Sequence, residues 1–422
     1  MTEKTALPPL KGVRVLALTQ AWAGTLATEQ LALMGAEVIQ VESRSRPDVW
    51  RGGYRAPIPA MLRASETAQH GWNVSPLFNS INLQKEGITL DLGQPEGIDI
   101  LRELIARSDV VAENFSPRVM GNLGIGYSAL EEIRPGIIML SMSAFGATGP
   151  YAFYPGIGGT VEAVSGMCSQ LGYPGGPPLN SGMMIPDPIA GYFGAAAVLL
   201  ALYHRNRTGN GQHIDLSMQT VCATFLADAL MQFSALREVR PRMGNRHPEF
   251  APHNIYPCAG EDQWIAIAAE NDADFEQLAA VAREPSWASD ARFCTNASRK
   301  KNEAELDELI AAWTSAQPAL ELERQLISVG LLAARVSGPS DLLLNEQLWH
   351  RRTLAHATHP EAGTFAAATT PMHLRGMSHD VVAPAPLLGQ HSRDVFGRLL
   401  NMSDAQYERL KEQGITGEQP PL

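Results

Sequence analysis

The amino-acid sequence predicts an α/β fold built on a parallel β-sheet. Short apolar segments of strand length alternate with segments of helical spacing along the N-terminal half of the chain, and this alternation is typical of βαβ units. The chain has 422 residues, of which 45% are hydrophobic. A large core is therefore expected, and about two to three domains of roughly 150 residues fit the length.

The predicted elements follow one another in a regular order. An apolar strand at residues 13–18 (VRVLAL) precedes a helical segment at 24–35, which stops at a glycine, and a second strand at 36–42. Such short apolar runs are typical of strands buried on both faces of a parallel sheet. The pattern then recurs, with strands at 87–92, 109–115, 136–146 and 211–218 and helices at 95–108, 188–203 and 220–236.

A change in composition marks a second, smaller domain. Residues 237–250 are basic and rich in turn formers, as in a linker. From about residue 250 to 330 the sequence predicts a strand at 262–269 and helices at 302–313 and 319–328. This segment is interpreted as a mixed α/β domain, followed by a tail with strand-like pieces and two helices after Gly389.

Charge and cysteine usage exclude several classes of protein. The formal net charge of −11 argues against nucleic acid or an anionic membrane as the main partner. The apolar run from Pro188 to Tyr203 is shorter than the ~18 residues of a membrane span, and the N-terminus lacks a signal-like apolar core. The four cysteines are far apart with no CxxC pair, which argues against disulfides. A cytoplasmic protein is expected.

Common site motifs are missing. No GxGxxG follows the first strand, so a standard dinucleotide-binding site is not expected. His350, His356 and His359 cluster, but Pro360 follows directly and no carboxylate or thiolate has a matching spacing, so no metal site is predicted. No GxSxG motif supports hydrolase chemistry.

Asp187 stands between two prolines at the start of the long apolar helix, and the local sequence leaves two interpretations open. Aspartate is a favoured N-cap and Pro188 suits the first helical position, which favours a structural cap. A helix N-terminus also stabilises an anion by roughly 0.3–1 kcal/mol. An ionised carboxylate kept in an apolar place is a competent nucleophile toward an acyl group.

The chain resembles the family III CoA-transferases, the formyl-CoA and carnitine CoA-transferase group, over nearly its full length. The resemblance is carried by an opening block, PLKGVRVLALTQAWAGTLATEQLALMGAEVIQVE, and by the distinctive block NLQKEGITLDLGQPEGIDILRELIARSDVVAENFSPRVMGNLGIGYSAL. The blocks SMSAFGATGPYA, RNRTGNGQHIDLSM and APLLGQHSRDVF follow in the family's order.

The resemblance implies a domain arrangement and an assembly. It implies a large Rossmann-like domain from both chain ends, residues 1–225 and 335–422, and a small inserted domain with its linkers at 226–334. It also implies an interlocked dimer, formed with an identical or a related chain.

The resemblance also implies a chemistry centred on Asp187. In this family the nucleophilic aspartate lies in a D-x-x-x-G stretch, which here begins at Asp187 and ends at Gly191. CoA would pass from an acyl-CoA donor, for instance succinyl-CoA, to a carboxylic acid acceptor through an aspartyl-CoA intermediate. CoA is then a substrate, and no metal or tightly bound cofactor is expected.

Family correspondence also points to residues that contact CoA. These are the loop after the first strand, the end of the second strand, a lysine and an Asn-Phe pair: Ala21, Trp22, Ala23, Arg44, Lys85, Asn114 and Phe115. Arg118 is added because it is a nearby basic residue. Leu83 stands where many relatives carry an arginine, and Gln40 where a lysine is common, so the details of CoA contact differ here.

Two alternatives remain. An acyl-CoA racemase or epimerase of the same superfamily carries a His-Asp pair where this chain has Ile157 and Gly158, so its proton-transfer base is missing. The chain is alternatively one subunit of a hetero-oligomeric CoA-transferase. Trp22, Met183 and Met184 near the site favour an acid larger than formate or oxalate.

Overall fold

The computed structural model describes residues 8–52, 57–58, 67–375 and 382–421. The chain forms two compact units. The large unit comprises residues 1–167, 180–231 and 346–422, and the small unit comprises residues 168–179 and 232–345. Both ends of the chain therefore contribute to the large unit.

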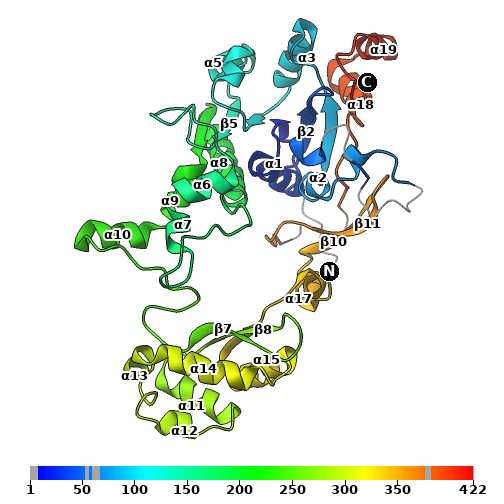
Figure 1. Cartoon of the computed structure of the whole chain (residues 1–422). Helices are drawn as coiled ribbons and strands as arrows, with labels where there is room; N and C mark the ends of the chain where they lie inside the picture. Colours follow the sequence, from blue (N-terminus) through cyan, green and yellow to red (C-terminus); the bar gives the residue numbers. More distant parts are fainter. Residues whose placement is uncertain (1–7, 53–56, 59–66, 376–381, 422) are drawn as a thin grey trace. The chain divides into compact units, whose positions relative to one another are not determined.

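A six-stranded parallel sheet forms the centre of the large unit (Figure 1). Its order is β3-β2-β1-β4-β5-β6, with every neighbouring pair parallel. The predicted parallel α/β fold is confirmed. The strands are β1 (Arg14–Leu18), β2 (Glu37–Glu42), β3 (Lys85–Thr89), β4 (Val110–Glu113), β5 (Ile138–Ser143) and β6 (Gln212–Ser217).

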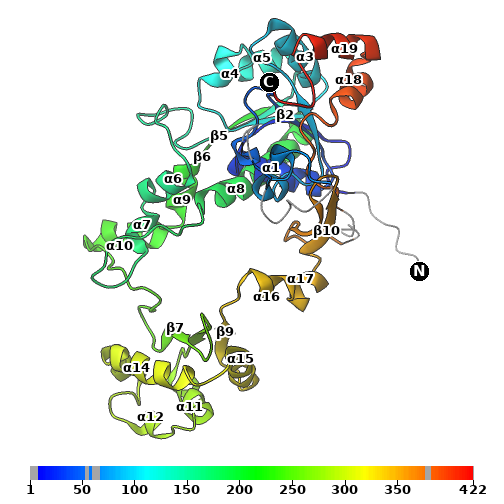
Figure 2. The same ribbon diagram turned by 45° about the vertical axis from the view of Figure 1, so that its right-hand side comes forward.

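Helices cover both faces of this sheet, and each face has its own hydrophobic core. On one face, α1 (Ala23–Leu33) and α8 (Pro186–Thr208) pack together with the apolar side chains of β1, β4 and β5. On the other face lie α3 (Pro95–Ile105), α5 (Tyr127–Ile133), α18 (Ser392–Leu400) and α19 (Asp404–Glu412). Figures 1 and 2 both show α18 and α19, from the C-terminus, close to α3.

The long apolar helix α8 packs one face against the core of the large unit. A Cβ atom on Gly191 would lie 2.9 Å from the Ala23 carbonyl oxygen, and one on Gly194 would lie 2.6 Å from Met142 Cε. Glycine at these two positions therefore lets α8 approach α1 and the sheet closely. The helix is long and apolar enough to cross a membrane by length and composition alone, but a core helix passes the same test.

Shorter elements complete the large unit and its connections. The predicted helix at 220–236 is broken into two helices, α9 (Met218–Thr224) and α10 (Ala227–Leu236). An antiparallel hairpin, β10 (Leu354–His359) and β11 (Gly363–Ala368), precedes the C-terminal helices. The remaining elements are η1 (Val49–Arg51), η3 (Gly71–Asn73), α2 (Pro76–Asn79), α4 (Val119–Asn122), α6 (Gly158–Val164), α7 (Met167–Gln170) and α17 (Glu346–His350).

The small unit has a three-stranded antiparallel sheet of order β7-β8-β9. Its strands are β7 (His253–Pro257), β8 (Trp264–Ala268) and β9 (Leu332–Arg335), and helices pack against them around one core. The helices around this core are α11 (Asp272–Val281), α12 (Ser286–Ser289), α14 (Glu303–Thr314) and α15 (Ala319–Ser328). Two short helices, α13 (Asn296–Lys301) and, after β9, α16 (Pro339–Leu343), complete the unit.

Candidate active site

The large unit has a cavity at the carboxyl edge of its parallel sheet. The strand order reverses between β1 and β4, and segments that follow β1, β4 and β5 line a cavity of about 450 Å³. In open α/β sheets such a switch point is where ligands bind. The lining residues are Gln20, Ala21, Ala23, Val49, Trp50, Asn114, Phe115, Ser116, Pro117, Met142, Ser143, Ala144, Ala152, Phe153, Tyr154, Pro155, Gly156, Ile157, Gly158, Met184, Asp187 and Met218.

Asp187 is the one charged side chain among these described lining residues. Helix α8 begins at Pro186 with Ile185 as its N-cap, so Asp187 lies within the first turn. The interpretation of Asp187 as the N-cap, with Pro188 at the first helical position, is therefore wrong by two residues. The helix starts earlier because Pro186 supplies the preset φ of a first-turn position.

Burial and backbone hydrogen bonding act in opposite directions on the Asp187 carboxyl. Burial raises its pKa to about 6, and hydrogen bonds from the N–H groups of Ala23 and of Asp187 itself act against that rise. Ala23 is the first residue of α1, so the N-termini of two helices meet at this carboxyl group. Both helix ends favour the anion. Its Oδ2 atom is buried and has no hydrogen-bond partner among the described residues.

Gly158 leaves room for the Asp187 carboxyl group. A Cβ atom built on Gly158 would lie 1.8 Å from Asp187 Oδ2 and 2.8 Å from Met184 Cβ. No other amino acid fits at position 158 without moving the carboxyl group or its helix. This glycine therefore lets the N-terminus of α6 lie directly against the Asp187 carboxyl group.

Two side chains fix the loop that follows β1. The Asn114 amide holds the backbone of Gln20 on both sides, because its Oδ1 accepts from Gln20 N–H and its Nδ2 donates to Gln20 O, each at 2.8 Å. The Asp48 carboxylate accepts from Ala21 N–H, with 3.1 Å to each oxygen. The loop then enters α1 at Ala23.

The structure brings several of the predicted site residues together. Ala21, Ala23, Asn114 and Phe115 line the cavity with Asp187. Trp22 is not among the lining residues; its ring contacts Trp50, with centroids 5.3 Å apart, and Trp50 is part of the wall.

The predicted basic residues occupy different surroundings. The Arg118 guanidinium is exposed and lies 3.9 Å from the ring centroid of Phe153, a residue of the cavity wall. Arg44 binds the C-terminal segment: its Nε donates to Gln419 O at 2.6 Å and its Nη1 to Thr416 O at 3.0 Å. Arg118 is therefore the predicted cation nearest to the cavity wall.

Lys85 points into the protein and not into the cavity. Its side chain is buried, and its Nζ donates to Thr25 O and Asn82 Oδ1, each at 2.9 Å. Burial lowers the pKa of Lys85 to about 7, while Glu29, Asp48 and Glu42 act to raise it. These bonds hold the ammonium group of Lys85 inside the core, away from the residues that line the cavity.

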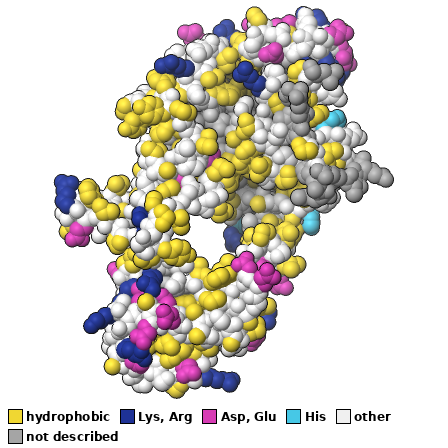
Figure 3. All heavy atoms as spheres, viewed as in Figure 1, with side chains coloured by type: hydrophobic (Ala, Val, Ile, Leu, Met, Phe, Trp, Pro, Cys, Tyr) yellow, Lys and Arg dark blue, Asp and Glu magenta, His cyan; other side chains and the backbone are white. Residues whose placement is uncertain are grey.

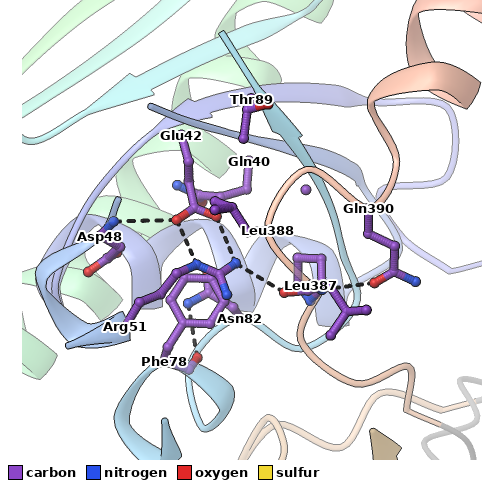
Figure 4. Close-up of polar contacts among 12 residues, drawn as sticks. Gln40, Glu42, Asp48, Arg51, Phe78, Asn82, Thr89, Leu387, Leu388 and Gln390 are labelled. Atoms are coloured by element: carbon purple, nitrogen blue, oxygen red, sulfur yellow. Dashed lines mark hydrogen bonds and ion pairs between the residues drawn. The ribbon is translucent and has the colours of Figure 1, made fainter. Parts of the chain in front are cut away.

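A buried charge network lies beneath the loop after β1, where β2 ends (Figure 4). Glu42 accepts two hydrogen bonds from Arg51, from Nε and Nη2, each at 2.8 Å. Arg51 also donates to Pro386 O at 3.0 Å, and its guanidinium lies 3.5 Å from the Phe78 ring centroid. The network therefore ties the end of β2 to the C-terminal part of the chain.

Sequence reasoning missed three residues of this site: Asp48, Trp50 and Gly158. Asp48 follows Pro47 in an irregular segment, where an aspartate is normally read as a turn residue. In the sequence, position 158 drew attention only because racemases carry an aspartate there and this chain has a glycine. No group of three or more His, Cys, Asp or Glu side chains suited to a metal occurs in the described part of the chain.

Comparison with known proteins identifies the family. The model of CoA-transferase family III matches residues 10–392. This chain belongs to CoA-transferase family III. The family III resemblance drawn from the sequence blocks is thereby confirmed.

Two relatives of this CoA-transferase match it along almost their whole length. It is 33% identical over 408 residues to the succinyl-CoA–D-citramalate CoA-transferase of Chloroflexus aurantiacus, covering 96% of this chain and 98% of that one. It is 29% identical to the succinyl-CoA–L-malate CoA-transferase beta subunit of the same organism, covering 98% and 100%. A CaiB/BaiF family protein from Brucella suis has a similar structure, with a TM-score of 0.83, 29% identity and coverage of 93% and 100%.

Proposed function

We propose that Asp187 is the nucleophile of this CoA-transferase and carries CoA between two carboxylic acids. The observation that supports this role is the lone carboxyl group in the cavity, with Oδ2 unpartnered among the described residues and two helix N-termini beside it. With a pKa of about 6 the group is ionised at neutral pH. A carboxylate in so apolar a wall is weakly solvated and reactive toward an acyl carbon.

The proposed reaction proceeds by covalent exchange. The Asp187 carboxylate attacks the carbonyl carbon of the acyl-CoA donor, the C–S bond breaks, and a mixed anhydride and CoA thiolate form. The thiolate attacks the Asp187 carbonyl carbon and releases the donor acid as its carboxylate. The acceptor carboxylate then attacks the aspartyl-CoA thioester and releases the thiolate. The thiolate finally attacks the acceptor carbonyl, giving the new acyl-CoA and free Asp187.

Each tetrahedral intermediate in this sequence develops negative charge on a carbonyl oxygen. The Ala23 N–H already interacts with the Asp187 carboxyl group. A backbone N–H at a helix N-terminus is a preorganised donor for such an oxyanion. We assign Ala23 N–H to this role in the steps that occur at the Asp187 carbon.

The racemase alternative has less support. Ile157 and Gly158 cannot transfer protons, and the space in which an acid side chain at position 158 would lie is occupied by Asp187 Oδ2. Proton abstraction needs a base within hydrogen-bond reach of the substrate. The geometry therefore favours acyl transfer over α-proton exchange.

The cavity wall favours an acid with an apolar substituent. Trp50, Phe153, Tyr154 and Met184 line it, and none of its described lining residues is Lys, Arg or His. Aromatic and thioether side chains suit rings and alkyl groups. We propose succinyl-CoA as a donor, because three relatives are named for it, and Arg118 as a contact for a CoA phosphate.

The transfer is tested by incubating the protein with a panel of acyl-CoA esters and free acids and reading the exchanged CoA esters by mass spectrometry. Acids should include succinate, glutarate, hexanoate and 3-phenylpropionate. We expect transfer, with the ring-bearing acid used at least as well as the dicarboxylates. Exchange with no acid of any class contradicts the proposed function, and a strict preference for small dicarboxylates contradicts the proposed acid class.

We also propose that two chains assemble into an interlocked dimer. Figure 3 shows many hydrophobic side chains, in yellow, on the visible surface. On α8 and just after α9, Leu200 is 70% exposed, Tyr203 61% and Phe225 54%. Apolar surface of this kind typically marks a protein interface.

Sedimentation over a wide concentration range tests this assembly. An interlocked dimer does not dissociate on dilution, because separation requires unthreading of the chains. A reversible monomer–dimer equilibrium with micromolar affinity contradicts interlocking. The relative named as a beta subunit motivates a second arm, in which co-purification with a related chain would indicate a hetero-oligomer.

A further inference from the structure

The Asp48 carboxylate lies beneath the loop that leads to the candidate active site, outside the predicted set of site residues. Its side chain is buried. It accepts hydrogen bonds from Ala21 N–H, at 3.1 Å to each oxygen, and from Trp50 N–H at 2.8 Å. One carboxylate thus holds the backbone on both sides of the cavity mouth, because Ala21 and Trp50 both line the cavity.

Ala21 needs such a partner because of its backbone conformation. Its φ of 55° lies in the left-handed region, which is uncommon for a residue with a side chain. The residue before it is clamped by Asn114, and the residue two places after it begins α1. The conformation of Ala21 therefore sets the direction in which the chain enters α1, and with it the position of Ala23, which lines the cavity together with Asp187.

Asp48 is itself held in place from below. Its own N–H lies 3.4 Å from Glu42 Oε1, and Glu42 is fixed by the two hydrogen bonds from Arg51. Figure 4 shows Glu42 between Asp48 and Arg51 at the end of β2. Arg51 is fully buried and bound to the C-terminal segment at Pro386. The support beneath Asp48 is therefore rigid, and its carboxylate has little freedom to follow a loop that moves.

We propose that Asp48 is a positioning residue for the transfer reaction: it holds Ala21 in the left-handed conformation and so aims Ala23 N–H at the Asp187 carboxyl group. This inference rests on the proposed function, because it assumes that Asp187 is the reacting group. Asp48 is not among the residues that line the cavity with Asp187. It acts through the backbone from residue 21 to residue 23.

Titratable groups lie close to both Asp48 and Asp187. Burial and the neighbouring Glu42 raise its pKa to about 6, while the two backbone donors and Arg51 oppose the rise. Lys85 and Glu29 belong to the same buried group of charges. Near Asp187 the titratable groups are Cys222 on α9 and, through Cys222, Glu162 on α6.

The test compares the full-length wild-type protein with Asp48→Asn. The amide keeps the size of the side chain but turns one acceptor into a donor that faces Ala21 N–H. We expect kcat to fall about 10- to 100-fold, with KM for the acyl-CoA within about threefold. The acidic limb of the pH profile should move to higher pH, because Asp187 loses the N–H that favours its ionised form. The same shift should appear in the rate of hydroxamate formation at Asp187.

Asp109→Asn is the matched control. Asp109 also accepts from a backbone N–H, that of Arg14 at 2.9 Å, and pairs with Arg205 at 3.1 Å, but it lies at the amino end of β4, away from the cavity. Its loss should lower stability and leave the pH profile unchanged. Asp48→Asn with kcat and pH profile equal to those of Asp109→Asn overturns the proposal. Wild-type protein without transfer or hydroxamate formation instead contradicts the proposed function.

Two further variants keep the inference testable if Asp48→Asn does not fold. Asp48→Glu retains the charge next to Arg51 but displaces the acceptor from Ala21 N–H, and the same loss of kcat is expected. Ala21→Gly, added to either variant, should recover part of kcat, since glycine adopts a positive φ without strain. A folded Asp48→Glu protein with wild-type kcat, or no recovery on adding Ala21→Gly, contradicts the positioning role.

Discussion

The two halves of the sheet's carboxyl edge differ in the number of charged groups that they bury. Past β1, β4 and β5 the chain leaves an open, largely apolar cavity with one carboxyl group, that of Asp187. Past β2 it buries a dense set of charges, including Glu42, Asp48 and Arg51. Lys85, at the amino end of β3, is buried as well. There, most charged groups are held by ion pairs or hydrogen bonds, as in the Glu42–Arg51 pair.

This difference separates groups that hold the structure from the group proposed to react. A buried charge that is paired and hydrogen-bonded stays where it is and has little reactivity left. Asp187 instead lines the cavity, with backbone donors near its carboxyl group and one oxygen, Oδ2, that has no partner among the described residues. A basic residue near a site is a poor indicator of ligand contact unless its nitrogen atoms are free, as the burial of Lys85 illustrates.

The largest expected effect comes from removing the charge of Asp187. Asp187→Asn keeps the shape of the side chain and removes the anionic nucleophile. Transfer should fall at least 10³-fold, whereas the affinity for CoA should be retained, because the wall residues remain. Transfer rates and CoA binding by calorimetry measure the two quantities.

A chemical trap gives an independent readout of the same residue. Wild-type protein given an acyl-CoA and hydroxylamine should carry a hydroxamate at Asp187, seen in a peptide spanning residues 182–204. Near-normal turnover by Asp187→Asn, or label on a different carboxylate alone, would remove Asp187 from the mechanism.

The second prediction concerns the buried charged groups around Lys85. Lys85→Met removes a buried cation, leaves Thr25 O and Asn82 Oδ1 without their donor and takes away the positive charge near Glu29. The free energy of unfolding should therefore fall by about 3 kcal/mol. KM for the acyl-CoA should change less than about twofold, since Nζ does not face the cavity. Denaturant unfolding and steady-state kinetics measure these effects.

Matched variants sharpen this second prediction. Adding Glu29→Gln to Lys85→Met should restore part of the lost stability, because the unpaired buried acid is removed with its cation. Arg118→Ala, next to the cavity wall, should instead raise KM several-fold without loss of stability. A large rise in KM for Lys85→Met with unchanged stability would return Lys85 to the CoA contacts.

The smallest effect is a gain of stability on losing Asp187. Its pKa is raised from 3.8 to about 6 in the folded protein, so the folded state binds the proton more tightly than the unfolded chain. The ionised group therefore destabilises the fold fully above about pH 6, and this penalty disappears as the pH falls toward 4. Asp187→Asn should raise the free energy of unfolding by about 1–2 kcal/mol at pH 8 and by less at pH 5. A gain independent of pH would contradict the raised pKa.

Much of the fold could be predicted from local patterns. Strand and helix periodicity predicted β1, β2, β4 and β5, because buried parallel strands are short, apolar and separated by helical spacing. The ends of elements were less predictable. The start of α8 moved to Pro186, and the segment at 220–236 broke into α9 and α10.

In the candidate site, too, some residues could be predicted from local sequence and others could not. Asp187 and the Asn-Phe pair after β4, which line the cavity, could be named from the sequence because they lie in recognisable sequence blocks. Asp48 and Trp50 were missed, since their roles depend on contacts with residues 21 and 22, across 27 and 28 positions of sequence. The inward direction of Lys85 was also beyond local patterns, because only the packing of β3 against α1 determines where its nitrogen lies.

Residues that lie some 300 positions later in the sequence complete the outer edge of strand β3. Gly87 exchanges hydrogen bonds with His391, and Thr89 N–H donates to Ser392 Oγ at 3.1 Å. At roughly 5–20 residues per second, a ribosome needs about 15–60 s to reach those partners. During that time the nascent chain presents an unpaired sheet edge, which is a template for wrong pairing. Synthesis of this protein therefore depends on protection of that edge until the C-terminal helices emerge, and C-terminal truncations should aggregate during expression.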